Sequence, residues 1–107
     1  MNREKMIKEL EVLYKSKLEL MKKKNSDYAR KNDCFSNFEI SAIVSGMSVE
    51  RVFLSIIGIK LARALELIMN CGIAENESLE DTLIDLSNYV DLFLLWIKNG
   101  NEIFKEE

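Results

Sequence analysis

The chain has 107 residues, of which 48% are hydrophobic and 31% are charged, and its formal net charge is −3. This length is typical of one domain with a modest core, and so many hydrophobic residues exclude a disordered chain. The acidic balance argues against a protein that coats nucleic acid, since duplex binding usually requires a basic surplus. No hydrophobic run reaches membrane-spanning length and the N-terminus lacks a signal-like hydrophobic segment, so we expect a cytoplasmic protein without a membrane partner.

The residue types that are missing narrow the chemistry. Histidine is absent, and the two cysteines, Cys34 and Cys71, stand alone in the sequence. Structural zinc would therefore lack ligands, and we interpret both cysteines as reduced and structural. Without histidine, Ser-His and Cys-His catalysis are excluded. Any reaction must use carboxylates, lysine, arginine, tyrosine or a metal ion.

Helix is the expected conformation throughout, because proline is absent and glycine is rare. Hydrophobic periodicity predicts helices over residues 3–24, 35–45, 49–71 and 78–100. Gly46 is expected to end the second helix, while Ser48 and Ser78 are expected to cap the third and fourth. The sequence therefore predicts an all-α fold, a small bundle of three long helices plus one short helix, in a single domain over residues 1–107.

The last predicted helix begins with stacked carboxylates. Glu77, Asp81, Asp85 and Asn88 fall within about 80° of one another on a helical wheel, in a sector that they share with large hydrophobic residues. Carboxylates on a half-buried face need a cation, a metal or a ligand beside them. This run is therefore the best candidate for a site.

A second anomaly lies in the third predicted helix, where Lys60 and Arg63 share a sector with hydrophobic residues. Two cations on a buried face are costly unless anions match them, and Asp81 and Asp85 are the expected partners. One interpretation is a buried salt-bridge network between the third and fourth helices. The other is a phosphate or metal-phosphate between the two charged rows. Gly58 would let another backbone or a ligand approach this helix closely.

A third cluster surrounds the polar segment after the first helix and comprises Lys24, Asp27, Tyr28, Asn37 and Phe38. The two aromatic rings could hold a base, and the carboxamide could read a base edge through its paired donor and acceptor. The alternatives are that the aromatic residues anchor a loop in the core and that Asn37 caps the short helix.

Two large aromatic residues, Phe35 of the second predicted helix and Trp96 of the fourth, are assigned to packing. Leu92, Leu95 and Trp96 also share the sector of the stacked acids, and a hydrophobic patch there would favour self-association. We therefore expect a homo-oligomer.

Taken in order, four elements resemble a small phage and bacterial family called the nucleotide modification associated domain, type one. They are Lys24-x-x-Asp27-Tyr28, Ser36-Asn37-Phe38, Lys60-x-x-Arg63 and the run from Glu77 to Tyr89. The resemblance covers about residues 20–95. It implies a phage-type protein associated with nucleotide modification, acting in the host cytoplasm if a phage encodes it. The nucleotide-binding residues that follow are Lys24, Asp27, Tyr28, Asn37, Phe38, Lys60, Arg63 and Asn88.

The chain is also similar, more distantly, to the MazG-like and dimeric dUTPase group of all-α nucleoside triphosphate pyrophosphatases. Those proteins are oligomeric helical bundles that hold magnesium on the acidic patterns EExxE and ExxD. The similarity implies Mg²⁺ bound by Glu77, Asp81 and Asp85, with Asp81 and Asp85 as catalytic residues. The EExxE pattern is missing from the third helix, where Lys60 and Arg63 stand.

Three functions are compatible with these observations. The first is a Mg²⁺-dependent nucleotide pyrophosphatase or nucleotide-modification factor. The second is a non-catalytic nucleotide-binding protein, such as a sponge for a host defence signal nucleotide or a subunit of a modification complex. The third is a structural oligomeric adaptor whose charged rows form salt bridges.

Overall fold

The structure, a computed structural model, describes residues 1–28, 33–70 and 76–100, except for the side chains of residues 27, 28, 76–78 and 100. Its elements are α1 (Arg3–Tyr28), α2 (Ser36–Ser45), α3 (Val49–Asn70), α4 (Asn76–Leu95) and a π-helical turn (Trp96–Gly100). The described residues contain no strand, so the all-α fold is confirmed. None of the described helices is both long enough and hydrophobic enough to cross a membrane.

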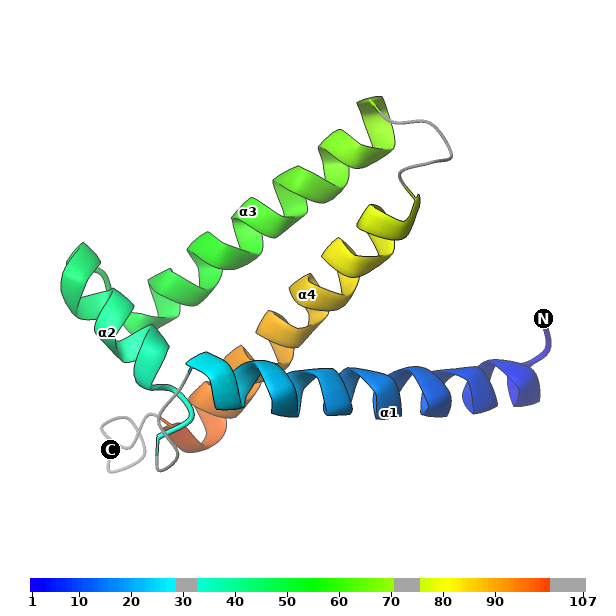
Figure 1. Cartoon of the computed structure of the whole chain (residues 1–107), viewed down its shortest axis with the longest axis horizontal. Helices are drawn as coiled ribbons and strands as arrows, with labels where there is room; N and C mark the ends of the chain where they lie inside the picture. Colours follow the sequence, from blue (N-terminus) through cyan, green and yellow to red (C-terminus); the bar gives the residue numbers. More distant parts are fainter. Residues whose placement is uncertain (29–32, 71–75, 101–107) are drawn as a thin grey trace.

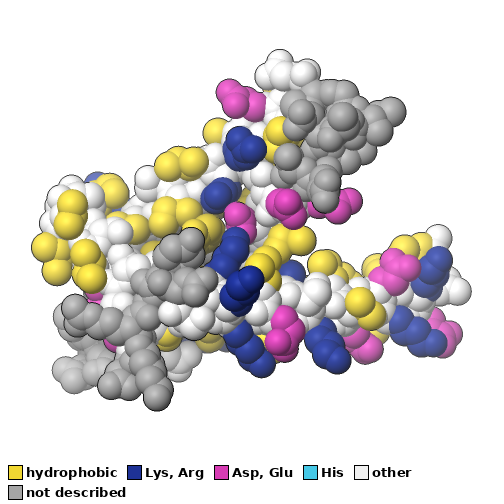
Figure 2. All heavy atoms as spheres, in the orientation of Figure 1, with side chains coloured by type: hydrophobic (Ala, Val, Ile, Leu, Met, Phe, Trp, Pro, Cys, Tyr) yellow, Lys and Arg dark blue, Asp and Glu magenta, His cyan; other side chains and the backbone are white. Residues whose placement is uncertain are grey.

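The helices are arranged as a hairpin with one projecting arm (Figure 1). Helices α3 and α4 run antiparallel and pack against each other, and the short α2 packs on α3. Helix α1 crosses the second half of α4, and its N-terminal half extends away from the other helices. An ion pair from Lys17 to Asp91, with 3.3 Å between Nζ and Oδ2, joins α1 to α4. Figure 2 shows the open notch that this arrangement leaves between α1 and the hairpin.

The core lies where α2, α3 and the end of α4 meet, and aromatic rings build it. Phe53 has no exposed surface, and its ring stacks on Phe38 and on Phe93, with centroids 4.2 and 5.0 Å away. Trp96 meets Phe35 edge to face at 5.4 Å. The packing roles predicted for Phe35 and Trp96 are confirmed. Of the patch predicted for self-association, Trp96 is wrong because it is only 9% exposed, whereas Leu95 is 48% exposed.

Local hydrogen bonds explain where the middle helices begin and end. Gly46 ends α2 in the left-handed conformation, with φ of +70°, as its position predicted. Ser48 accepts a hydrogen bond at Oγ from the backbone N–H of Arg51 (3.2 Å), which confirms it as the cap of α3. The alternative that Asn37 caps α2 is wrong, because the cap position belongs to Phe35.

Two predicted boundaries are also wrong. Helix α1 continues to Tyr28 rather than ending at Lys24. Polar residues that suggested a turn make bonds compatible with helix, since the Ser26 hydroxyl donates to the Lys23 carbonyl at 2.8 Å. Helix α4 begins at Asn76, so Ser78 lies inside the helix and does not cap it.

Candidate functional site

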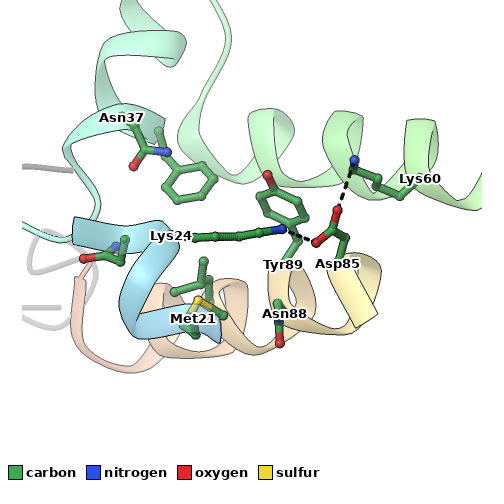
Figure 3. Close-up of a pocket in the computed structure, with 10 residues that line it drawn as sticks. Met21, Lys24, Asn37, Lys60, Asp85, Asn88 and Tyr89 are labelled. Carbon is green, nitrogen blue, oxygen red and sulfur yellow. Dashed lines mark hydrogen bonds and ion pairs between the residues drawn. The ribbon is translucent and has the colours of Figure 1, made fainter. Parts of the chain in front are cut away.

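One pocket gathers most of the residues that the sequence singled out, at the place where α1 ends against α2, α3 and α4. Its volume is about 290 Å³. The lining comes from all four helices and comprises Met21, Lys24 and Asn25 of α1, Asn37 and Phe38 of α2, Lys60 of α3, and Asp85, Asn88, Tyr89 and Leu92 of α4. Figure 3 shows these side chains around the pocket.

The charged centre of the pocket is Asp85, which two lysines reach from different helices (Figure 3). Lys24 extends from the last part of α1 to Oδ1, and Lys60 reaches Oδ2 from α3 with 3.5 Å between the atoms. The side chains of Lys24, Lys60 and Asp85 are 44%, 30% and 25% exposed, so water still reaches all three. Two cations around one anion leave one positive charge in excess among the described residues that line the pocket.

Two carboxamides add unsatisfied hydrogen-bonding groups to the same pocket. Asn88 lies one turn after Asp85 on α4 and is 6% exposed, yet its Nδ2 has no hydrogen-bond partner in the described part of the chain. The buried Oδ1 of Asn37 likewise lacks a partner among the described residues. Leaving a buried polar atom unsatisfied costs about 1–3 kcal/mol, so such atoms are rare in native structures. The walls of the pocket therefore contain one unused donor and one unused acceptor, both of them buried.

Aromatic rings close the pocket on its core side. Phe38 is 3% exposed, stacks on Phe53 and meets Tyr89 edge to face with centroids 6.2 Å apart. The interpretation of Phe38 as a core anchor is therefore confirmed, although the residue also lines the pocket. Its packing fixes the wall against which a ligand would lie.

Other predicted site residues lie elsewhere. Arg63 and Asp81 are both exposed, neither lines the pocket, and within the described residues no ion pair joins them. The expectation that Arg63 would be buried is wrong, because Arg63 lies about 60° around α3 from Lys60 and the packing that partly covers Lys60 does not extend to it. Of the expected salt-bridge network, the structure contains the pair between Lys60 and Asp85. The side chains predicted at Asp27, Tyr28 and Glu77 lie outside the described residues.

Four residues that line the pocket were not among the predicted site residues, namely Met21, Asn25, Tyr89 and Leu92, although Tyr89 ends the acidic run and Leu92 shares the sector of its acids. Met21 lies one helical turn before Lys24, so its position on the same face of α1 was available from the spacing. Asn25 was placed in the polar segment after the first predicted helix, whereas it lies within α1 and its Nδ2 donates to the Cys34 carbonyl at 3.0 Å, which ties α1 to the segment before α2. That contact has no signal in the sequence.

The acidic residues that the structure describes do not fit a magnesium site by themselves. Among them no group of three or more metal-binding side chains comes together. Both oxygens of Asp85 are engaged by lysines. Mg²⁺ needs oxygen ligands in octahedral geometry, usually one or two carboxylates with waters or phosphates. A site on Glu77, Asp81 and Asp85 stays a prediction, because the Glu77 side chain is outside the described part.

Comparison with known proteins adds nothing to this geometry, since no family model, no curated protein and no solved structure matches the chain. What the pocket binds has to be inferred from its own residues.

Proposed function

We propose that the pocket binds a small anionic molecule of the nucleotide class. The observation that supports this most is the coincidence, in one pocket, of two converging lysines with the unpartnered carboxamide atoms of Asn37 and Asn88. A purely structural ion pair gives no reason for unsatisfied amides beside it. A ligand that carries a phosphate together with hydrogen-bond donors and acceptors offers partners to both sets of groups.

In this proposal each part of the pocket has one role. Lys24 and Lys60 hold phosphate oxygens through charge-assisted hydrogen bonds, while Asp85 keeps the two ammonium groups together when the ligand is absent. Asn37 and Asn88, which lie on opposite sides of the Lys24 side chain (Figure 3), bond to separate polar groups of the ligand. A volume of about 290 Å³ lies near the lower end of the range for small-molecule pockets, which suits one nucleotide better than a larger ligand.

Binding without hydrolysis is the form of the proposal that the charges favour. Because Asp85 is held by two lysines, it is poorly placed to serve as a free metal ligand or base. Hydrolysis by a Mg²⁺-dependent nucleoside triphosphate pyrophosphatase, the activity that the resemblance to the MazG-like group implies, is the second candidate. Its support is the presence of a carboxylate next to the proposed phosphate site. A sponge for a signal nucleotide and a subunit of a modification complex are both compatible with simple capture.

A thermal-shift screen of nucleotides, with and without Mg²⁺, tests the proposal, since a ligand bound only by the folded state raises Tm as its concentration rises. The ligand is then released and analysed. An intact nucleotide indicates capture, and released pyrophosphate indicates hydrolysis. A flat response to mononucleotides, dinucleotides and cyclic forms would leave the structural adaptor as the better explanation.

A pair of variants shows whether the pocket is responsible. Replacing both Lys24 and Lys60 by Gln should remove the thermal shift. The matched control is Lys22→Gln, also on α1, whose side chain is 65% exposed and pairs with Glu19. It should leave the shift unchanged. An unaltered shift in the double variant would show that the ligand binds elsewhere.

We also infer that the chain acts as a homo-oligomer. It exposes 8396 Å², whereas a folded monomer of 12.4 kDa is expected to expose about 6,100 Å². Its radius of gyration is 16.1 Å, against about 13 Å for a compact domain of this length. Both quantities favour a subunit whose surface is completed by another copy.

A further inference from the structure

Helix α3 carries a regular hydrophobic stripe on its uncovered side. Leu54, Leu61, Leu65 and Ile68 are 58%, 58%, 57% and 64% exposed. Together with Gly58 they follow one another at intervals of four and three residues, the spacing of a seam between two packed helices. We call these five residues the outer stripe of α3. Nothing in the described chain covers it.

Within a single copy, neither the available space nor the backbone conformation requires glycine at position 58. A Cβ added there would meet no atom within 4 Å, so space does not require glycine. Its φ is not positive either, since Gly46 is the glycine with positive φ in the described residues. Glycine weakens the interior of a helix relative to alanine, because it loses more backbone entropy on folding. The close approach of another helix would explain why it is tolerated.

The neighbours of Gly58 suit such an approach. Ser55 and Ala62 are small, uncharged and exposed, and on a helical wheel they adjoin the outer stripe. Arg63 falls on the opposite side of the helix and Lys60 points toward Asp85. Arg51 adjoins the stripe but lies two turns before Gly58, so a second helix would meet no charged side chain within one turn of Gly58 on this face.

We propose that the outer stripe of α3 packs against the same stripe of a second copy, with the two helices closest at Gly58. The contact is isologous, so each residue of the stripe finds its partner in the same surface. The proposal rests on the self-association inferred above. The chain exposes about 2,300 Å² more than a compact monomer of its mass. This excess belongs to the chain as a whole, and the outer stripe of α3 is one part of it.

The competing surface is the groove that lines the notch between α1 and α4, with a volume of about 840 Å³. Leu13 and Tyr14 form one wall, and Leu83 and Val90 the other. It lacks an equivalent of Gly58, and nothing in it indicates which helix would fill it. The α1–α4 groove is therefore the alternative dimer surface.

Analytical ultracentrifugation of the full chain and its variants decides between the surfaces. We expect the parent chain to be dimeric at micromolar concentration and Leu61→Glu to be monomeric with unchanged helical circular dichroism. The matched control is Leu13→Glu, in the α1–α4 groove, which should remain dimeric. A monomeric parent chain at 100 µM, about a hundredfold above a typical micromolar dissociation constant, would overturn both the self-association and the proposed surface. A dimer that Leu13→Glu disrupts and Leu61→Glu does not would overturn the α3 surface alone.

Gly58→Ala keeps the proposal testable if Leu61→Glu fails to fold. In a monomer the added methyl group meets open space, so the urea midpoint of the chain at dilution below dimer dissociation should rise. In the dimer the same methyl group lies at the closest approach, so the dissociation constant should increase about tenfold. A rise in the urea midpoint with no change in the dissociation constant would refute the contact at Gly58.

Discussion

The carboxamides of Asn37 and Asn88 reach one pocket from different helices, and each leaves a buried atom unpaired within the described structure. The unpaired atoms are complementary, since Asn37 offers an acceptor and Asn88 a donor. The two carboxamides lie on opposite sides of the Lys24 side chain (Figure 3), so they would bond to separate polar groups of a ligand. Lys24 and Lys60, in the same pocket, supply the positive charge that such a ligand needs if it carries phosphate.

Replacing Asn88 by Leu should stabilise the empty protein and weaken the ligand complex. Removing the unsatisfied donor recovers about 1 kcal/mol of unfolding free energy, because no bond is lost with it. Affinity for the ligand should fall at least about tenfold, as expected when a bond worth roughly 1.5 kcal/mol is removed. Urea denaturation and isothermal titration calorimetry measure the two effects. The exposed Asn70, replaced in the same way, should change neither. A destabilised Asn88→Leu protein would show that the amide is structural.

Asp85→Asn should strengthen the binding of anions. The carboxylate competes with an incoming phosphate for the ammonium groups of Lys24 and Lys60, so its neutralisation should raise affinity several-fold at low ionic strength. The cost in unfolding free energy should stay below about 1 kcal/mol, because the three side chains are partly exposed. Titration with a nucleoside monophosphate at two salt concentrations checks this. A large loss of affinity would instead mean that the carboxylate itself contacts the ligand.

Gly46→Ala should destabilise the fold by about 1 kcal/mol, because φ at this position is +70° and a Cβ disfavours that conformation. The measurement is urea denaturation at a fixed protein concentration. Ser41→Ala, an exposed change within the same helix, should alter stability by less than about 0.5 kcal/mol and serves as the control.

Magnesium ions alone should not raise Tm beyond the effect of an equal ionic strength. The described acids do not converge on a metal site, and the oxygens of Asp85 are engaged. With a nucleoside triphosphate present, Mg²⁺ is expected to add to the shift through the phosphates. A rise in Tm with millimolar Mg²⁺ alone, abolished by Asp81→Asn or Glu77→Gln, would instead establish the site predicted from the acidic run.

Much of the fold could be predicted from the sequence because helices are local. The hydrophobic period located the helices, and Gly46 and Ser48 marked the turn between α2 and α3 through their own backbone and side-chain preferences. The end of α1 was wrong for a tertiary reason. Asn25, in a segment that suggested a turn, remains in the helix and bonds to the carbonyl of Cys34.

The site was predicted in its residue types but not in its pairing. The spacing within the third helix put Lys60 on a buried face and made Asp81 and Asp85 its expected partners. The structure contains the pair with Asp85. Lys24 lies 61 positions away from Asp85, and its contact depends on how α1 crosses α4, which no helical wheel contains. Arg63 failed for a related reason. Lys60 and Arg63 were expected to share one buried face of the third helix, whereas the packing against α4 partly covers Lys60 and leaves Arg63 exposed.

Trp96 gives this chain a built-in spectroscopic probe of one region. It is the single tryptophan, its ring packs on Phe35, and its indole N–H donates to Glu50 of α3 at 3.4 Å. Its fluorescence therefore reports whether α2, α3 and the end of α4 remain together, whereas circular dichroism is dominated by total helix, of which α1 is the longest piece. Because none of the described side chains of α1 belongs to the buried core cluster, heating should lower the circular dichroism before it changes the fluorescence. The temperature difference between the two transitions would measure how independently α1, with Lys24, separates from the rest of the pocket.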